Sequence, residues 1–429
     1  MAFPNQGEIS VSGADNFQLL LDRHMKQNGQ PGNIVRLELR FGNEVNLEKM
    51  KSGLESSKAT KLVNQIKLKP KSWGVGKWSI TEMAHQTKIQ IHRNANTRYF
   101  HSNILNRKVN LDESAIAIDL LEMENREKKM VISAHHALFD QRGMINLLYA
   151  LSKNKIDYEK LWPIPKPVSA WKQVKSSFQI SAKLLFPPSW KLASLSKEKG
   201  NSENAAIYHE LNFSKEETSQ IEINAKSNGA LLGNTPFYLA ASCLAVQSIL
   251  QLRSEDPSYY WLPIPQNSRP KGEQGHLFSN DLSFMFFKLK KAEFGSLTQA
   301  TRTIVQQFKQ QVRQNIPGRY SELLRLFRNL PISLFLNMVK LPTAGAISSF
   351  SFSDLGQNRN EMKKFMGQEL TDMVNYPPVP NPPGLVTVFM KYNHRLKVLI
   401  GYHSAALEEE ELLNLTKYLR NNLFDTTKQ

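Results

Sequence analysis

Apolar and polar residues alternate along several short runs in the first third of the chain. Residues 34–41 read Ile-Val-Arg-Leu-Glu-Leu-Arg-Phe, and this period of two predicts a half-buried strand. A charged turn at residues 124–127 joins two strand-like runs and predicts a hairpin. The run at residues 144–151 has a helical pattern instead. Helices are expected at 16–21 and 144–151, and another is expected to begin at residue 46. Strands are expected at 34–41, 116–123 and 129–133.

The second half of the sequence starts the same order of strand and helix again. Ser214 and Glu217 form a capping box, which predicts a helix N-terminus at this point. Thr235 is expected to cap another helix that has proline in its first turn, and Ser296 to cap a third. The expected strands are 208–213, 259–264, 282–289, 385–390 and 396–402, and the other expected helices are 235–252, 297–316 and 407–423.

The strand-like run at 129–133 leads directly into a cluster of titratable side chains. His135 and His136 are adjacent, and Asp140 follows four residues after the second histidine. A strand end can hold an imidazole in a cleft, where the neutral ring can accept a proton near pH 7. The pattern predicts a catalytic site, with polar residues that merely end a strand as the alternative. A metal site is not expected, because neighbouring strand side chains point apart and no further ligands stand at metal-like spacing.

The spacing His135-His136-x-x-x-Asp140 resembles the HHxxxD motif of the CoA-dependent acyltransferase superfamily. This superfamily includes condensation domains of peptide synthetases, wax-ester and diacylglycerol acyltransferases, and alcohol acetyltransferases. The resemblance implies an α/β fold of two chloramphenicol-acetyltransferase-like domains that form a pseudo-dimer with a central tunnel. In the family a glycine usually follows the aspartate directly, whereas Gln141 and Arg142 stand before Gly143 here.

The resemblance also implies a role for each residue of the motif. His136 is the expected general base, which removes a proton from a hydroxyl or amine as that group attacks a thioester. His135 is expected to support it. Asp140 is expected to form a structural ion pair with Arg269, which follows a strand of the second half, and Gly143 to support the turn.

Two stretches of the second half resemble segments that face the histidine in this family. Asn280 ends a Gly-x-x-x-x-Asn stretch and is expected to orient substrate, with a simple turn residue as the alternative. Ser353 is expected to supply a donor to the oxyanion, although Asp354 stands where the family usually has asparagine. The proline-rich residues 376–384 are expected to cross between the domains, with an inert surface loop as the alternative.

Composition limits the class of protein. The 429 residues allow two domains, expected at 1–160 and 205–429 with a connection at 161–204. The single cysteine, Cys243, excludes a disulfide framework within this chain and is expected to be a core residue on a helix. The sequence shows no secretory signal and no stretch of eighteen apolar residues. We therefore expect a cytoplasmic protein without a spanning helix.

The charge balance indicates the class of partner. A formal net charge of +17 attracts anions such as CoA phosphates, an acidic carrier protein or an anionic membrane. The segment 160–200 has eight lysines and one glutamate beside Trp171, Phe178, Phe186 and Trp190. It suits a membrane or carrier-protein contact, with a solvated linker helix as the alternative. Residues 323–339 are strongly apolar but interrupted by two arginines and a proline, so a core helix, an acyl channel and a membrane-surface helix all stay open. Nucleic acid is not expected, because no nucleic-acid motif is present.

The expected function is acyl transfer from a CoA or acyl-carrier-protein thioester to a hydroxyl or amine. The thioester is a donor substrate, and no bound cofactor is expected. The acceptor is expected to be a small molecule or lipid-like, and peripheral membrane association is left open. One alternative is a condensation enzyme that joins carrier-bound substrates in trans. Another is a non-catalytic member of the fold that recruits a carrier protein or a membrane.

Overall fold

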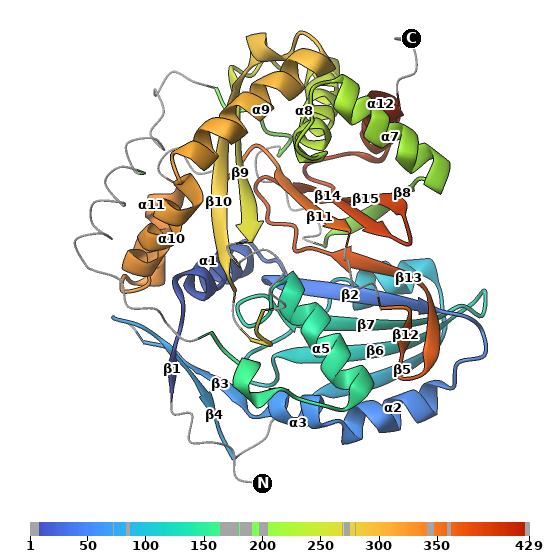
Figure 1. The fold of residues 1–429 in the computed structure, drawn as a ribbon. Helices are drawn as coiled ribbons and strands as arrows, with labels where there is room; N and C mark the ends of the chain where they lie inside the picture. Colours follow the sequence, from blue (N-terminus) through green and yellow to red (C-terminus); the bar gives the residue numbers. More distant parts are fainter. Residues whose placement is uncertain are drawn as a thin grey trace.

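A computed structural model of the chain shows strands and helices mixed in two stacked halves (Figure 1). The structure describes residues 8–71, 73–82, 86–163, 180, 191–196, 205–267, 269, 275–278, 280–340, 347–357 and 362–424. Each half is built around one main sheet. Helices cover the outer face of each sheet, and the inner faces of the two sheets meet between the halves.

The first main sheet has six strands in the order β12-β13-β2-β7-β6-β5. Alternate residues of β2 and β7, such as Leu37 and Ile132, pack under the helices of the outer face, where Leu54 and Leu147 complete the core. The two strands at one edge of this sheet come from the far end of the chain. The strands and covering helices are β2 (Ile34–Phe41), β5 (Lys88–Ala95), β6 (Ile116–Met123), β7 (Lys128–His135), β12 (Lys364–Phe365), β13 (Gln368–Tyr376), α2 (Leu47–Ser56), α3 (Lys58–Asn64) and α5 (Gln141–Lys153).

The second main sheet has four strands in the order β11-β14-β15-β8. Its outer face packs against a core of helices, where Tyr238 stacks on Phe389 with ring centroids 4.4 Å apart. The strands and helices are β8 (Ile207–Asn212), β11 (Ser351–Gln357), β14 (Leu385–Tyr392), β15 (Arg395–Tyr402), α7 (Lys215–Ser227), α8 (Thr235–Leu252), α9 (Leu297–Arg313) and α12 (Glu409–Phe424).

Apolar and charged residues both join the inner faces of the two sheets. Val131 and Val374 from the first sheet pack with Val388 and Leu399 from the second. Beside them Arg40 forms an ion pair with Glu210 at 2.5 Å, and Lys397 pairs with the same glutamate at 3.1 Å. The two sheets are therefore held by a shared core and by ion pairs.

A long hairpin reaches from the second half into the first. Strands β9 (Tyr259–Asn267) and β10 (Leu282–Lys290) pair in register from Asn267 and Leu282 outward, so the chain between them forms one loop, the β9–β10 loop. Phe278 in this loop is buried in the core of the first half, 4.6 Å from the Trp162 ring and 5.5 Å from the Phe139 ring. The loop thereby becomes part of the first half.

The remaining elements cover the flank of the molecule. Helix α1 (Gly13–Gln27) packs against α10 (Ile316–Phe327) and α11 (Ile332–Lys340) through Phe17, Leu20, Leu323 and Phe335. A small three-stranded sheet and short helical turns complete the described chain. They are β1 (Ile9–Ser10), β3 (Ile66–Lys69), β4 (Lys77–Ile80), α4 (Thr97–Tyr99), η1 (Phe100–Ile104), η2 (Tyr158–Lys160) and η3 (Lys291–Phe294).

Most of the elements expected from the sequence are confirmed, with shifts of a few residues at their ends. The capping box of Ser214 and Glu217 and the Ser296 cap are both present. The expected Thr235 cap is wrong, because Asn234 is the residue before the helix and the Thr235 hydroxyl donates to Asp354 instead. The helix expected at 297–316 ends at Arg313, and α10 begins three residues later.

The apolar segments lie mainly in the core. Helix α8 is long and apolar enough to cross a membrane, which the search for eighteen apolar residues did not show, but most of it is buried around Cys243. The stretch 323–339 is divided between α10 and α11, whose inner faces pack on α1. Trp171, Phe178, Phe186 and Trp190 lie outside the described residues, as does most of the expected connection at 161–204. The domain boundaries stay a prediction.

Candidate active site

The histidine pair lies at the end of a central strand. His135 is the last residue of β7 and is fully buried, whereas His136 is partly exposed. The chain then turns, and Asp140 caps α5 by accepting a hydrogen bond from the Gly143 N–H at 2.8 Å. The helix begins here because an aspartate oxygen satisfies an N–H group that has no partner within the helix.

The ion pair expected between Asp140 and Arg269 is present. One guanidinium nitrogen of Arg269 lies 2.5 Å from Asp140 Oδ2, and the arginine side chain is only 4% exposed. The Asp281 N–H also donates to Oδ2, at 3.4 Å. Both partners lie near the ends of the β9–β10 loop, so the turn after the histidines is attached to the second half of the chain.

The position of Gly143 in α5 explains why two residues can stand between it and Asp140. Asp140 caps the helix, which places Gly143 in its first turn. A Cβ atom on Gly143 would lie 2.8 Å from the Leu277 carbonyl oxygen. The glycine is thus required by the close approach of the β9–β10 loop rather than by a special turn after Asp140.

The surroundings of His136 favour a neutral ring. Burial lowers the pKa of the ring below its usual value, and this effect outweighs the nearby Asp140 charge and the backbone groups that raise it. Nδ1 is enclosed, so the exposed part of the residue lies elsewhere. The main-chain N–H donates to the Asn33 carbonyl at 2.9 Å. A neutral imidazole in a fixed backbone can act as a proton acceptor at pH 7.

His135 is held from two sides and has no exposed surface. Its Nδ1 accepts the Ala137 N–H at 3.3 Å, so the proton of the neutral ring is on Nε2. Nε2 lies 3.3 Å from Oδ1 of Asp22, which is on α1. A fully buried ring with these partners suits support of the turn.

Asn280 contacts the motif through its side-chain amide. Nδ2 donates to the carbonyl oxygens of His136 and Ala137 at 2.9 and 3.0 Å, and to Asp15 Oδ1 at 3.0 Å. Asp15 is buried on α1, and burial raises the pKa of its carboxyl group. The amide protons of Asn280 are therefore used on the protein, and its substrate-orienting role stays a prediction.

Asp15, Asp22 and Asn33 were not identified from the sequence. A usable signal was present, because Asp15, Gln18 and Asp22 fall three and four residues apart and so share one face of α1. Gln18 accepts from the Asn33 side chain at 2.8 Å. Polar residues with helical spacing in an otherwise buried helix indicate a face that binds something polar.

The remaining predicted residue lies in the second sheet. Ser353 is in the middle of β11, opposite Val388, and is partly buried. Within the described chain no hydrogen bond joins it to His136, so its oxyanion role stays a prediction. The neighbouring Asp354 accepts from the Thr235 hydroxyl at 2.6 Å, which gives the unusual aspartate a structural partner on α8. The loop at 376–384 connects β13 of the first sheet to β14 of the second.

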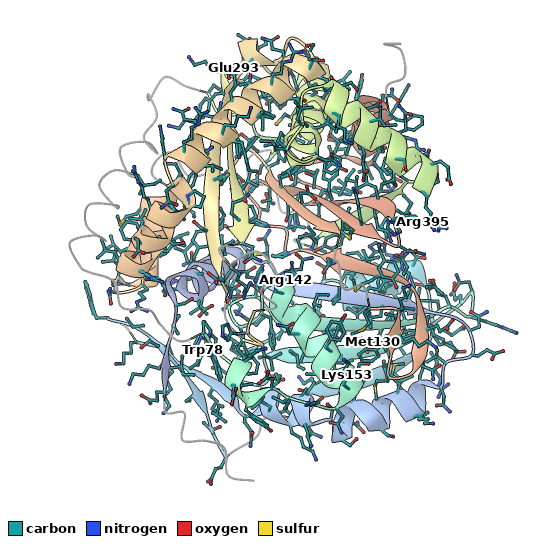
Figure 2. The ribbon with its side chains drawn as sticks, viewed as in Figure 1. Trp78, Met130, Arg142, Lys153, Glu293 and Arg395 are labelled. Carbon is teal, nitrogen blue, oxygen red and sulfur yellow. The ribbon has the colours of Figure 1, made fainter. Side chains whose placement is uncertain are left out.

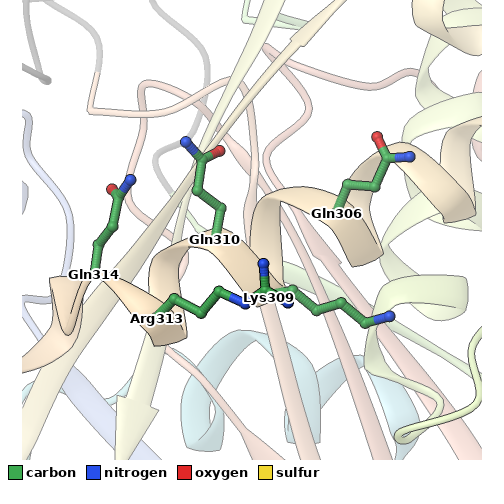
Figure 3. Close-up of a pocket in the computed structure, with 5 residues that line it drawn as sticks. All are labelled: Gln306, Lys309, Gln310, Arg313 and Gln314. Carbon is green, nitrogen blue, oxygen red and sulfur yellow. The ribbon is translucent and has the colours of Figure 1, made fainter.

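Two surface cavities lie outside the histidine turn. One of about 520 Å³ lies along α5, with Arg142 and Lys153 at opposite ends of the helix (Figure 2). Its other lining residues include Lys155, Lys160 and Leu277. The second, of about 430 Å³, is lined from α9 by three glutamines and two cations (Figure 3). Neither is lined by His136. In the part of the chain that the structure describes, no group of three His, Cys, Asp or Glu residues could hold a metal ion.

Comparison with known proteins gives matches by structure only. No protein-family model matches the sequence, and no curated protein matches it. Trichothecene 15-O-acetyltransferase TRI3 from Fusarium sporotrichioides is 12% identical, with a TM-score of 0.69 over 97% of this chain and 95% of that one. The wax ester synthase/diacylglycerol acyltransferase from Marinobacter aquaeolei VT8 is 12% identical, with a TM-score of 0.61 over 96% and 98%.

A starter condensation domain gives a similar match. This domain of rhizomide synthetase RzmA, solved in complex with C8-CoA, is 12% identical, with a TM-score of 0.64 over 97% of this chain and 94% of that one. At these identities the likeness concerns the fold. The chain has the α/β fold that these acyltransferases share with condensation domains.

Proposed function

We propose that the protein transfers an acyl group from a thioester to a hydroxyl or amine, with His136 as general base. The observation that carries this proposal is the state of His136. The residue is partly exposed, burial of its ring favours the neutral form, and Asn33 and Asn280 hold its main-chain N–H and carbonyl groups. The shared fold supports the same chemistry, because the similar structures include an acetyltransferase and a wax ester synthase.

The reaction follows from this arrangement. His136 removes a proton from the acceptor as its oxygen or nitrogen bonds to the thioester carbonyl carbon. The tetrahedral intermediate carries its negative charge on the former carbonyl oxygen, and Ser353 is our candidate donor to it. When the C–S bond breaks, the leaving thiolate takes the proton from His136. The products are an ester or amide and a free thiol, and the base returns to its neutral form.

The donor is a CoA thioester or a carrier-bound thioester. A structural neighbour was solved with C8-CoA, which supports the first choice for this chain. The net charge of +17 supports either, because both donors are anionic. Offering the same acyl group on CoA and on a phosphopantetheinyl carrier protein would separate simple acyl transfer from condensation between carrier-bound substrates. The acceptor panel should contain alcohols and amines, including lipid-like ones.

The test of the base is His136→Ala in a transfer assay with acyl-CoA donors and this acceptor panel. We expect kcat to fall at least about 100-fold, because a positioned base contributes about 10² to 10⁴. The matched control is His209→Ala, which removes a partly exposed histidine from β8. Wild-type transfer activity in His136→Ala would contradict the assignment.

The pH profile gives a second view of the same group. Because burial lowers the pKa of His136 from its usual value, the neutral form predominates at pH 7 to 8. We expect kcat/KM to be constant in that range and to fall only on the acid side of about pH 6.5. An acid limb that starts above pH 7 would show that another group controls the reaction.

A further inference from the structure

We propose that Asp22 is a positioning residue for the base, which acts on His136 through His135 and Asn33. This inference rests on the proposed function for its kinetic consequence. The geometry itself does not depend on which acyl group is transferred.

One carboxylate oxygen contacts the two anchors of the His136 backbone, which are Asn33 and the His135 ring. Asp22 Oδ1 accepts the Asn33 N–H at 2.9 Å and lies 3.3 Å from His135 Nε2. Asn33 in turn accepts the His136 N–H through its carbonyl oxygen at 2.9 Å, and the His135 ring accepts the Ala137 N–H at 3.3 Å. The peptide groups on both sides of the His136 side chain therefore lead back to a single oxygen on α1, on one side by hydrogen bonds through Asn33 and on the other by the 3.3 Å contact with the His135 ring.

The charge on Asp22 reinforces this arrangement. Burial alone would raise its pKa, but the contacts with His135 and Lys26 outweigh that effect and lower the pKa to about 2. Asp22 is thus an anion at neutral pH and faces the ring nitrogen that carries the proton. A ring turned to present a lone pair to the carboxylate would be repelled, so the anion selects one orientation of His135.

The fold leaves space for this one position of the carboxylate. Gly32 has a φ of +109°, and a Cβ atom there would lie 2.5 Å from Asp22 Oδ1. Any larger residue would push the carboxylate away from Asn33 and His135. The space at Gly32 is an observation independent of the hydrogen bonds, and it permits the position of Oδ1 that those bonds require.

Four variants separate this role from general stabilisation. Asp22→Ala removes Oδ1, Asp22→Glu displaces the carboxylate by one methylene, and Asp22→Asn keeps an oxygen that can accept from Asn33. Lys26→Ala is the control, because it removes the 2.7 Å ion pair of the same carboxylate but neither anchor. A displacement of about 1 Å near the reacting groups can cost about 100-fold in rate. We therefore expect kcat to fall by about this factor in Asp22→Ala and Asp22→Glu.

The expected split between kinetic constants is specific to positioning. KM should stay within about threefold of wild type in these variants, and Asp22→Asn should retain at least about a third of kcat. A wild-type kcat in Asp22→Glu would overturn the proposal. This test holds even if Asp22→Ala does not fold. Asp22→Asn as inactive as Asp22→Glu would overturn it too, because the oxygen would then not be the acting group.

Amide hydrogen exchange tests the geometry without any substrate. The N–H groups of His136 and Ala137 should exchange faster in Asp22→Glu than in wild type, and at the wild-type rate in Lys26→Ala and Asp22→Asn. Unchanged protection of both groups in Asp22→Glu would overturn the proposal. If wild-type protein shows no acyl transfer while this pattern of exchange holds, the proposed function fails and the positioning geometry stands.

Discussion

Asp140 has partners from three parts of the chain, and none of them is the His136 ring. Its two oxygens accept from Gly143 on α5, from the Arg269 guanidinium and from the Asp281 main chain. The side chains of Asp140 and Arg269 are 16% and 4% exposed. Removing one partner of such a pair leaves a buried charge without compensation, which is more costly than the pair is stabilising.

Asp140→Ala should therefore destabilise the whole protein. We expect the free energy of unfolding to fall by about 3–5 kcal/mol, since Arg269 keeps its charge in a buried site. Denaturant unfolding measures this change. Asp256→Ala is the matched control, because that aspartate also forms an ion pair, with Lys291, but its side chain is 74% exposed. An unchanged unfolding midpoint in Asp140→Ala would show that the ion pair is not structural.

At this scale the sequence predicted the ion pair, which the structure confirms, but not the residues that hold the histidine pair. His135, His136 and Asp140 are consecutive enough to be recognised as one motif. Asp22 and Asn33 are distant in sequence from the motif. Asp22 meets it through the His135 ring, and Asn33 meets it through its main-chain carbonyl group. A main-chain contact such as that of Asn33 leaves no spacing signature, because any residue can offer a main-chain N–H or carbonyl group.

Among the elements, the β9–β10 loop does the most to shape the site. It carries Phe278 into the core of the first half, and the Leu277 carbonyl oxygen lies against Gly143. The loop and α5 can approach this closely only because the helix presents a glycine. The sequence predicted both strands of this hairpin. It could not show where the loop packs, because that depends on tertiary contacts and not on local pattern.

Gly143→Ala should disturb this contact although alanine is the better helix former. A Cβ atom 2.8 Å from a backbone oxygen forces either the helix or the loop to move, and such overpacking costs about 1–3 kcal/mol. We expect lower thermal stability together with lower transfer activity, because the displaced loop also carries Asn280. Gly42→Ala is the control, since nothing lies within 4 Å of a Cβ atom at that exposed position. Equal melting temperatures for the two variants would mean that the contact is easily relaxed.

For the molecule as a whole, buried neutral histidines are a common feature. Burial lowers the pKa of four histidine side chains below the ordinary value; they are His24, His101, His136 and His403. For His24 the pKa falls to about 4, through burial first and the Lys340 charge second. The unfolded chain takes up a proton at these sites near pH 6.5, whereas the folded chain does not. Stability from these groups is thus present above pH 6.5 and is lost as the pH falls.

His24 gives a measurable share of this acid sensitivity. Between pH 6.5 and 4 the His24 contribution to the free energy of unfolding should fall by about 3 kcal/mol, from its lowered pKa. His24→Gln should flatten the pH dependence in that window, as measured by denaturant unfolding at each pH. His209→Gln on β8 serves as the control. If His24→Gln and wild type have the same slope, the buried ring does not resist protonation.

The sequence also predicted the order of elements in both halves, but not that strands from the second half join the sheet of the first. Local patterns identified β2 and the hairpin of β6 and β7 because alternation is visible within eight residues. They could not show that β13 pairs with β2, since that partner lies near the other end of the chain. Long-range pairing is decided by the whole assembly of surfaces.

This shared sheet has a consequence for synthesis at the ribosome. When the first half has emerged, β2 has β7 on one side only, and its other edge offers unpaired N–H and carbonyl groups until β13 is made. An open strand edge is a template for pairing with other chains. The edge of β2 that pairs with β13 therefore stays open to other chains until residues 368–376 have been synthesised.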